Sequence, residues 1–228
     1  MKEVPSGINL LQFFHNLKVS RLLMIHQKNR YQQIHFVLSA ARLQQLPEDL
    51  GYEIAFAGRS NAGKSSVFNT LSGITNLAKT SKTPGRTRLI NIFSLDDMRR
   101  LIDLPGYGYA KVSQEIKTRW QHTLSLYLQE RQCLRGVILV MDIRHPMTPL
   151  DQSMIEWAIR RSLNLHILLT KADKLTKTAA LRTKNMLQQH LAPFELFISI
   201  QLFSSLKKTG IPELQVVLDQ WFEIPKAL

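Results

Sequence analysis

EIAFAGRSNAGKSSVF, residues 53–68, is the stretch of sequence that decides the fold. Residues 53–57 form a short, largely apolar run typical of a strand, and the residues from Val67 onward have helical spacing. Residues 58–65 therefore lie between a strand and a helix, the setting that a phosphate-binding loop requires. A glycine-containing surface turn is the competing interpretation, and the flanking strand and helix favour the phosphate-binding loop.

Each residue type in this loop suits phosphate binding. Gly58 and Gly63 can adopt backbone angles closed to other residues, which lets successive N–H groups point at phosphate oxygens. Lys64 supplies a cation for the β- and γ-phosphates of a nucleotide, and Ser65 supplies a hydroxyl for Mg²⁺. The loop predicts a nucleotide site with a magnesium ion.

Length and composition are typical of one domain with appendages. The chain has 228 residues, 44% of them hydrophobic, which is enough for one sizeable core. Cys133 is the only cysteine, so an intrachain disulfide and a cysteine-rich metal site are both excluded. This usage fits a reducing cytoplasm, and we expect Cys133 to be a buried apolar residue rather than a nucleophile.

No stretch predicts a membrane span or a cleaved leader. The longest apolar run, residues 137–141, is far shorter than the roughly 20 residues that cross a bilayer. Polar residues interrupt the apolar cluster near the N-terminus, and no small-residue cleavage site follows it. Met1 and Met24 are both candidates for the true start of the protein.

The chain carries a large excess of positive charge. Lys and Arg total 30 against 17 Asp and Glu, a formal net charge of +13. Such an excess favours a polyanionic partner, and RNA or a ribonucleoprotein is favoured over a membrane because no basic amphipathic helix accompanies a lipid anchor. A soluble protein that is merely basic is the alternative.

Strands and helices alternate along the chain, and a lead-in from Tyr31 to Pro47 should pack on the sheet edge. Further strands are predicted at residues 88–94, 98–104, 136–143, 163–169 and 194–202. Helices are predicted at residues 66–71, 115–132, 150–162 and 211–222. This order predicts a doubly wound α/β domain that binds its ligand at the carboxyl edge of the sheet.

A second polar motif, Asp103-Leu104-Pro105-Gly106, ends the strand predicted at 98–104. A carboxylate at this strand tip can hold Mg²⁺ through water, and the glycine lets a backbone N–H reach a γ-phosphate. The loop at residues 73–87 has few apolar anchors, and its hydroxyls, Thr83 and Thr87 among them, are candidates for a second Mg²⁺ ligand.

Polar residues also follow the next two apolar strands. Asp142, Arg144 and Asp151 cluster after the first, and positioning of a neighbouring loop is the only role we assign to them. The second ends in Thr170-Lys171-Ala172-Asp173. A carboxylate here can accept hydrogen bonds from guanine N1–H and N2–H₂, which adenine does not offer, whereas Asp173 as a helix N-cap is the simpler interpretation.

Five ordered motifs resemble the TRAFAC class of P-loop GTPases, and specifically the EngB (YihA/YsxC) family of bacterial ribosome-biogenesis GTP-binding proteins. They are GRSNAGKSS (58–66), TPGRT (83–87), DLPGYGYA (103–110), TKAD (170–173) and FSSLKKTG (203–210). The resemblance covers residues 31–222. It implies a three-layer, Ras-like P-loop GTPase fold, with helices on both faces of a mostly parallel six-stranded sheet that has one antiparallel strand. A single GTPase domain would span residues 31–228, after a loosely ordered extension of residues 1–30.

The resemblance also implies a role for each motif. Lys64, Thr87 and Gly106 would serve hydrolysis, and Ser65 and Thr87 would ligate Mg²⁺. GTP or GDP would contact Gly58, Arg59, Ser60, Asn61, Ala62, Gly63, Lys64, Ser65, Gly85, Arg86, Thr87, Arg88, Leu89, Asp103, Leu104, Pro105, Gly106, Thr170, Lys171, Ala172, Asp173, Phe203, Ser204 and Ser205.

Two positions depart from the wider GTPase pattern. Thr170 replaces the usual asparagine, which leaves guanine selectivity to Asp173. Tyr107 stands where Ras-like enzymes have the glutamine that orients the attacking water, so we expect slow intrinsic hydrolysis that a partner stimulates. Asn61 resembles the asparagine that helps to hold K⁺ in potassium-dependent relatives.

The expected function is that of a cytoplasmic, monomeric GTPase switch. It would bind a precursor of the large ribosomal subunit and its rRNA in the GTP form and would be needed for normal cell division and septation. Two alternatives stay open: a signalling or septation GTPase that acts on proteins without ribosome binding, and a nucleotide-binding scaffold with negligible catalysis.

Overall fold

The computed structural model describes residues 30–78, 89–108 and 124–225. Their strands form one sheet in the order β1-β3-β4-β2-β5-β6-β7, in which only β3 runs against its neighbours. The strands are β1 (His35–Ala40), β2 (Tyr52–Gly58), β3 (Ile90–Ser94), β4 (Arg99–Asp103), β5 (Leu134–Asp142), β6 (Asn164–Thr170) and β7 (Ile198–Leu202). The mostly parallel α/β fold with one antiparallel strand is confirmed.

The described sheet has seven strands, so the predicted count of six is wrong. The added strand is β1, which comes from the lead-in predicted to pack on the sheet edge. It pairs antiparallel with β3, and the ring of Phe36 packs edge-on against Phe93 at 5.8 Å. β1 lies at the edge of the sheet and is mostly exposed, so it lacks the long buried apolar run of the central strands, and its sequence pattern is weak.

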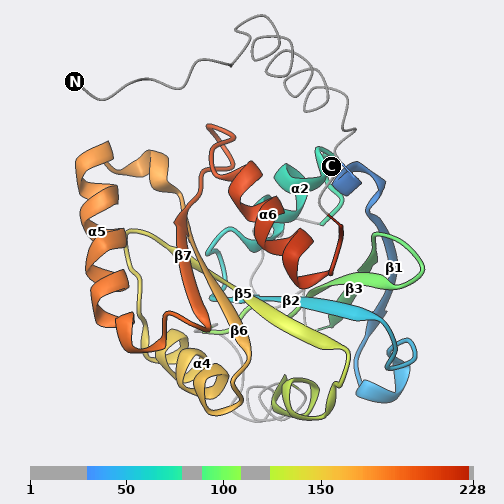
Figure 1. Ribbon diagram of the computed structural model, residues 1–228. Helices are drawn as coiled ribbons and strands as arrows, with labels where there is room; N and C mark the ends of the chain where they lie inside the picture. The colour runs from blue at the N-terminus through green and yellow to red at the C-terminus, as the bar shows by residue number, and fades with distance from the viewer. Residues whose placement is uncertain (1–29, 79–88, 109–123, 226–228) are drawn as a thin grey trace, which may run out of the picture.

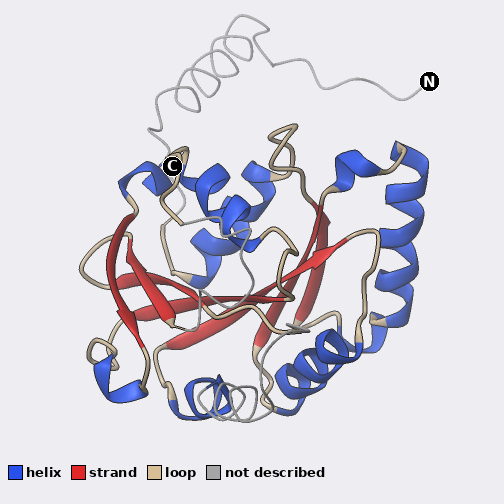
Figure 2. Ribbon diagram, turned by 180° about the vertical axis from the view of Figure 1, so that it is seen from behind, coloured by secondary structure: helices blue, strands red, loops and turns tan. Residues whose placement is uncertain are grey.

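Helices cover both faces of the sheet (Figures 1 and 2). The helices are α2 (Lys64–Ser72), α4 (Pro149–Arg160), α5 (Lys177–His190) and α6 (Ile211–Trp221), together with a helical segment at residues 124–130. The rest of the helix predicted at 115–132 falls largely outside the described residues. No described helix has the length and apolar character needed to cross a membrane.

Two apolar clusters join these layers. Side chains alternate along β2, so Ile54 and Phe56 face α2 and α6, whereas Ala55 and Ala57 face α4 and residues 124–130. All four side chains are at most 1% exposed. Burial on both faces explains why the central strands read as continuous apolar runs.

The parallel strands bring their carboxyl ends to one edge of the sheet. β2 ends at Gly58, β4 at Asp103, β6 at Thr170 and β7 at Leu202, so four of the five motifs begin at this edge. The last strand starts at Ile198 rather than at the predicted residue 194, because residues Ala192–Phe194 form a 3₁₀ turn whose Pro193 lacks the N–H that a strand ladder needs.

Candidate functional site

The loop between β2 and α2 has the geometry of a phosphate cradle. Gly58 approaches β5 so closely that a Cβ there would lie 2.5 Å from the Val140 carbonyl oxygen. Gly63 is the N-cap of α2 with φ of 104°, in the left-handed region that favours glycine. Asn61 also has positive φ, 63°. The loop therefore bends around the first turn of α2, where unsatisfied N–H groups favour an anion.

Lys64 and Asp103 meet inside this site. Lys64 is 9% exposed, and its ammonium donates a short hydrogen bond to Asp103 Oδ1. The other carboxylate oxygen, Oδ2, accepts from Asn91 Nδ2 at 3.3 Å. The two charges neutralise each other, and each has the chemistry to exchange its partner, Lys64 for a phosphate and Asp103 for a hydrated cation.

The Thr170–Asp173 motif is joined to the loop between β2 and α2. Lys171 Nζ donates to the Asn61 carbonyl oxygen at 2.7 Å and lies 2.9 Å from Asp142 Oδ2. Thr170 Oγ1 lies 2.9 Å from the Met141 carbonyl oxygen and within hydrogen-bond distance of Ala62 O. Thr170 thus links β5, β6 and the loop between β2 and α2.

A hydroxyl from the fifth motif orients Asp173. Ser204 Oγ donates to Asp173 Oδ1 and accepts from the Lys207 N–H at 3.0 Å. The Ala172 N–H also donates to the Phe203 carbonyl oxygen at 3.1 Å. The two loops therefore form one unit, and no group of the described residues donates a hydrogen bond to the other oxygen, Asp173 Oδ2. Such a carboxylate suits a ligand that offers paired N–H donors.

Asp142 is held ionised beside these loops. Burial opposes its ionisation, but hydrogen bonds from Arg144 and Lys171 outweigh that effect and keep the pKa of the Asp142 carboxyl well below its usual range. Arg144 Nε and Nη2 donate to the two oxygens at 2.9 and 2.6 Å. A cavity of about 230 Å³ lies here between the phosphate loop, the end of β5 and Asp151.

The expected site residues are only partly brought together in the described chain. Gly85, Arg86, Thr87 and Arg88 lie outside the described residues, and Leu89 lies directly before β3 with 37% of its surface exposed. Asp151, for which the sequence suggested only loop positioning, accepts a short hydrogen bond from the Tyr107 hydroxyl. Its position three residues after Thr148, before a helix, is the sequence signal of a capping box, but that signal does not point to Tyr107.

Comparisons with known proteins agree on one family. The profile of the family described as "50S ribosome-binding GTPase" matches residues 53–171. "Probable GTP-binding protein EngB" of Edwardsiella ictaluri is 54% identical over 199 residues, which cover 87% of this chain and 92% of the relative. Its counterpart in Glaesserella parasuis is 51% identical and covers 87% of this chain and 95% of the relative.

Solved structures show the same fold at lower identity. A crystal structure of a probable GTP-binding protein engB has a TM-score of 0.61 at 20% identity and covers 76% of this chain and 100% of that chain. Aquifex aeolicus Era bound to GDP.AlF4- has a TM-score of 0.59 at 20% identity and covers 77% of this chain and 57% of that one. These structures show the fold, and the profile and the close relatives show that the chain belongs to the EngB family of P-loop GTPases.

Proposed function

We propose that this GTPase is a cytoplasmic, monomeric switch in the assembly of the large ribosomal subunit, with a consequent role in normal cell division and septation. The observation that carries the proposal is the match to a family described as 50S ribosome-binding, combined with an excess of cationic side chains on this chain. The GTP form would bind the subunit precursor, and hydrolysis would release it.

The site suggests how the nucleotide would be held. Residues 58–65 would bind the phosphates, with Lys64 moving its hydrogen bond from Asp103 to the β- and γ-phosphates. Ser65 and Thr87 would ligate Mg²⁺, whose water shell Asp103 would hold. The ion would neutralise charge between the phosphates, and Asp173 would accept the guanine N–H groups. A K⁺ ion beside Asn61 would add a further positive charge.

Slow intrinsic hydrolysis is supported by the position of Tyr107. Its side chain is 3% exposed and its hydroxyl donates to Asp151, so it is not placed to orient an attacking water. Hydrolysis without a partner would then be on the order of the ~10⁻⁴ to 10⁻³ s⁻¹ of unassisted Ras-like enzymes. The ribosomal partner would supply or reposition the missing group.

A cationic surface beside the base-reading loops supports an RNA partner. Lys174, Lys177, Arg182, Lys207 and Lys208 are all exposed, and none of them forms an ion pair in the described structure. α5 itself contains no acidic residue. These cations lie on α5, on the turn before it and on the loop after β7, and contact with RNA phosphates would release counterions.

Sedimentation with purified large ribosomal subunits tests the proposal. We expect binding with a non-hydrolysable GTP analogue, much weaker binding with GDP, and a steep decrease as salt rises from 50 to 200 mM, as phosphate contacts require. The double variant Lys177→Glu/Arg182→Glu should bind less and with a shallower salt slope. Arg42→Glu/Arg160→Glu, a matched charge reversal elsewhere, should bind as the unaltered protein does. Binding that is absent, or equal with both nucleotides, would favour a GTPase that acts on protein partners.

A further inference from the structure

The buried hydrogen bond between Tyr107 and Asp151 joins two parts of the chain that are far apart in sequence. Tyr107 follows the Asp103–Gly106 motif, and Asp151 lies in the first turn of α4, 44 residues later. The exposed fraction of Asp151 is 1% and that of Tyr107 is 3%. Burial first, and the charge of Asp151 second, raise the pKa of the Tyr107 hydroxyl far above its usual value, so the phenol stays protonated and donates.

The two carboxylate oxygens of Asp151 have different hydrogen-bond partners. Oδ2 accepts from the Thr148 N–H at 2.9 Å and from the Thr148 hydroxyl at 2.7 Å, which completes the N-terminal cap of α4. Oδ1 accepts from Tyr107. Helix capping therefore uses only one oxygen, and capping alone does not account for the tyrosine contact.

The backbone of Tyr107 is at the same time paired with the phosphate loop. Its N–H donates to the Gly58 carbonyl oxygen at 3.2 Å, and its carbonyl oxygen accepts from the Ser60 N–H at 2.8 Å. Gly106 is consequently held against the loop, where a Cβ would lie 3.2 Å from the N and Cα of Ser60. The conformation of Gly106 thus depends on the next residue, Tyr107, whose hydroxyl is hydrogen-bonded to Asp151.

We propose that Asp151 is a positioning residue for the γ-phosphate: acting through the Tyr107 hydroxyl, it holds Gly106 docked on the phosphate loop, ready to meet the third phosphate of GTP. This inference rests on the proposed nucleotide site, in which the Gly106 N–H contacts the γ-phosphate. Because GDP lacks that phosphate, the tyrosine contact favours GTP over GDP and does not act on nucleotide affinity in general.

Tyr107→Phe removes the hydroxyl and keeps the ring. We expect its affinity for the GTP analogue GMPPNP to fall ~10-fold, the scale of one hydrogen bond to a charged group, while its affinity for GDP stays within ~2-fold. Titration with fluorescent GDP and GMPPNP measures both. Single-turnover hydrolysis should slow by a similar factor. Equal losses for the two nucleotides, or no loss, would overturn the inference and leave the contact a purely structural one.

Two further variants separate positioning from capping. Thr148→Ala weakens the cap but keeps the Tyr107–Asp151 bond, so it should lower thermal stability without changing the GMPPNP-to-GDP affinity ratio. Asp151→Ala should lower that ratio, and adding Tyr107→Phe to it should lower it no further. Additive effects of the two changes on the ratio would contradict the inference.

The same titrations distinguish this inference from the proposed function. They need no ribosomal particle, so an absence of subunit binding would not affect their outcome. If the unaltered protein discriminates between GMPPNP and GDP only through Mg²⁺ and Lys64, Tyr107→Phe will leave the ratio unchanged, and the inference fails while the GTPase assignment stands.

Discussion

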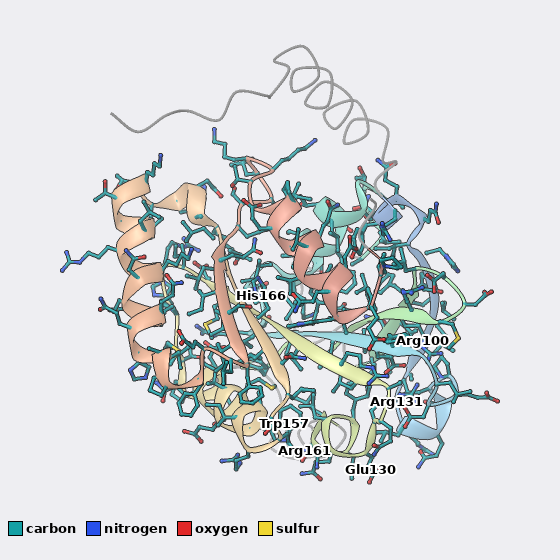
Figure 3. The ribbon with its side chains drawn as sticks, viewed as in Figure 1. Arg100, Glu130, Arg131, Trp157, Arg161 and His166 are labelled. Carbon is teal, nitrogen blue, oxygen red and sulfur yellow. The ribbon has the colours of Figure 1, made fainter. Side chains whose placement is uncertain are left out.

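Glu53 at the amino edge of the sheet differs from Lys64 and Asp173 at the carboxyl edge in its number of protein partners. At the amino edge, Glu53 is fully buried at the start of β2 and accepts from Arg131 at 2.7 and 3.0 Å and from Tyr127 at 2.9 Å. Arg100 Nε lies 3.2 Å away as a further cation. Figure 3 shows Arg100 and Arg131 close together. Glu53 and Arg100 lie near the starts of β2 and β4, whereas the nucleotide motifs follow the ends of the strands.

At the carboxyl edge, Lys64 and Asp173 each have few protein partners. Lys64 has Asp103, and Asp173 has the Ser204 hydroxyl. A group with one protein partner can exchange it for a ligand, whereas Glu53, which satisfies several donors at once, cannot be displaced without leaving buried donors unpaired. The Glu53 cluster at the amino edge therefore suits stabilisation of the fold, and Lys64 and Asp173 at the carboxyl edge suit ligand binding.

Lys64→Ala should have the largest effect on nucleotide binding at the carboxyl edge. It removes the cation placed for the β- and γ-phosphates, so we expect GTP affinity to fall at least ~10³-fold, about 4 kcal/mol or more. Equilibrium titration with GTP measures the loss, and Lys207→Ala, which removes an exposed lysine beside the base-reading loop, is the control. Retained affinity in Lys64→Ala would contradict the site.

Glu53→Ala should instead lower the stability of the fold, because it removes the central carboxylate of the amino edge. It removes the carboxylate that two largely buried arginine side chains and a buried tyrosine hydroxyl share, and we expect a loss of about 3 to 5 kcal/mol in the free energy of unfolding. Glu156→Ala, which removes an exposed ion pair to Arg160, should cost less than about 0.5 kcal/mol. Urea denaturation of both variants makes the comparison, and similar costs would remove the distinction between the edges.

The carboxyl edge could be predicted from sequence far better than the amino edge. The motifs at the strand ends can be recognised in the sequence because phosphate and guanine require particular residue types at fixed places, such as Gly63, Lys64 and Asp173. The Glu53 cluster could not be predicted, because its arginines come from residues 47 and 78 positions away and nothing local marks them as partners. The Tyr107–Asp151 bond escaped prediction for the same reason.

His166, on β6 between β5 and β7 (Figure 3), provides a smaller test of buried polar groups. Gln201 Nε2 donates to Gly210 O at 2.8 Å, so Gln201 Oε1 accepts from His166 Nε2–H at 2.9 Å, and His166 Nδ1 accepts from the Ser199 hydroxyl at 2.7 Å. Burial is the main cause that lowers the pKa of His166 to about 4. The folded state thus holds the ring neutral.

Stability should therefore depend on pH in a defined window. Above the unfolded pKa of ~6.5, His166 is neutral in both states and its protonation does not reduce the free energy of unfolding. As pH falls from ~6.5 toward 4, His166 takes up a proton in the unfolded state first, and up to about 3 kcal/mol of the free energy of unfolding is lost. Urea denaturation between pH 7 and 4.5 should show a steeper decrease for the unaltered protein than for His166→Gln. Equal slopes would show that His166 does not titrate on unfolding.

Nucleotide competition with Asp173→Asn tests the central claim, that the carboxyl edge reads guanine, most directly. The asparagine amide turns an N–H₂ toward the donors of guanine and loses a charge-assisted pair, whereas xanthine offers a carbonyl that can accept from it. We predict that the variant loses GTP by at least ~10²-fold and gains XTP, a crossover that misfolding cannot produce. Loss of GTP without a gain of XTP would contradict the account and reduce Asp173 to a structural residue of its turn.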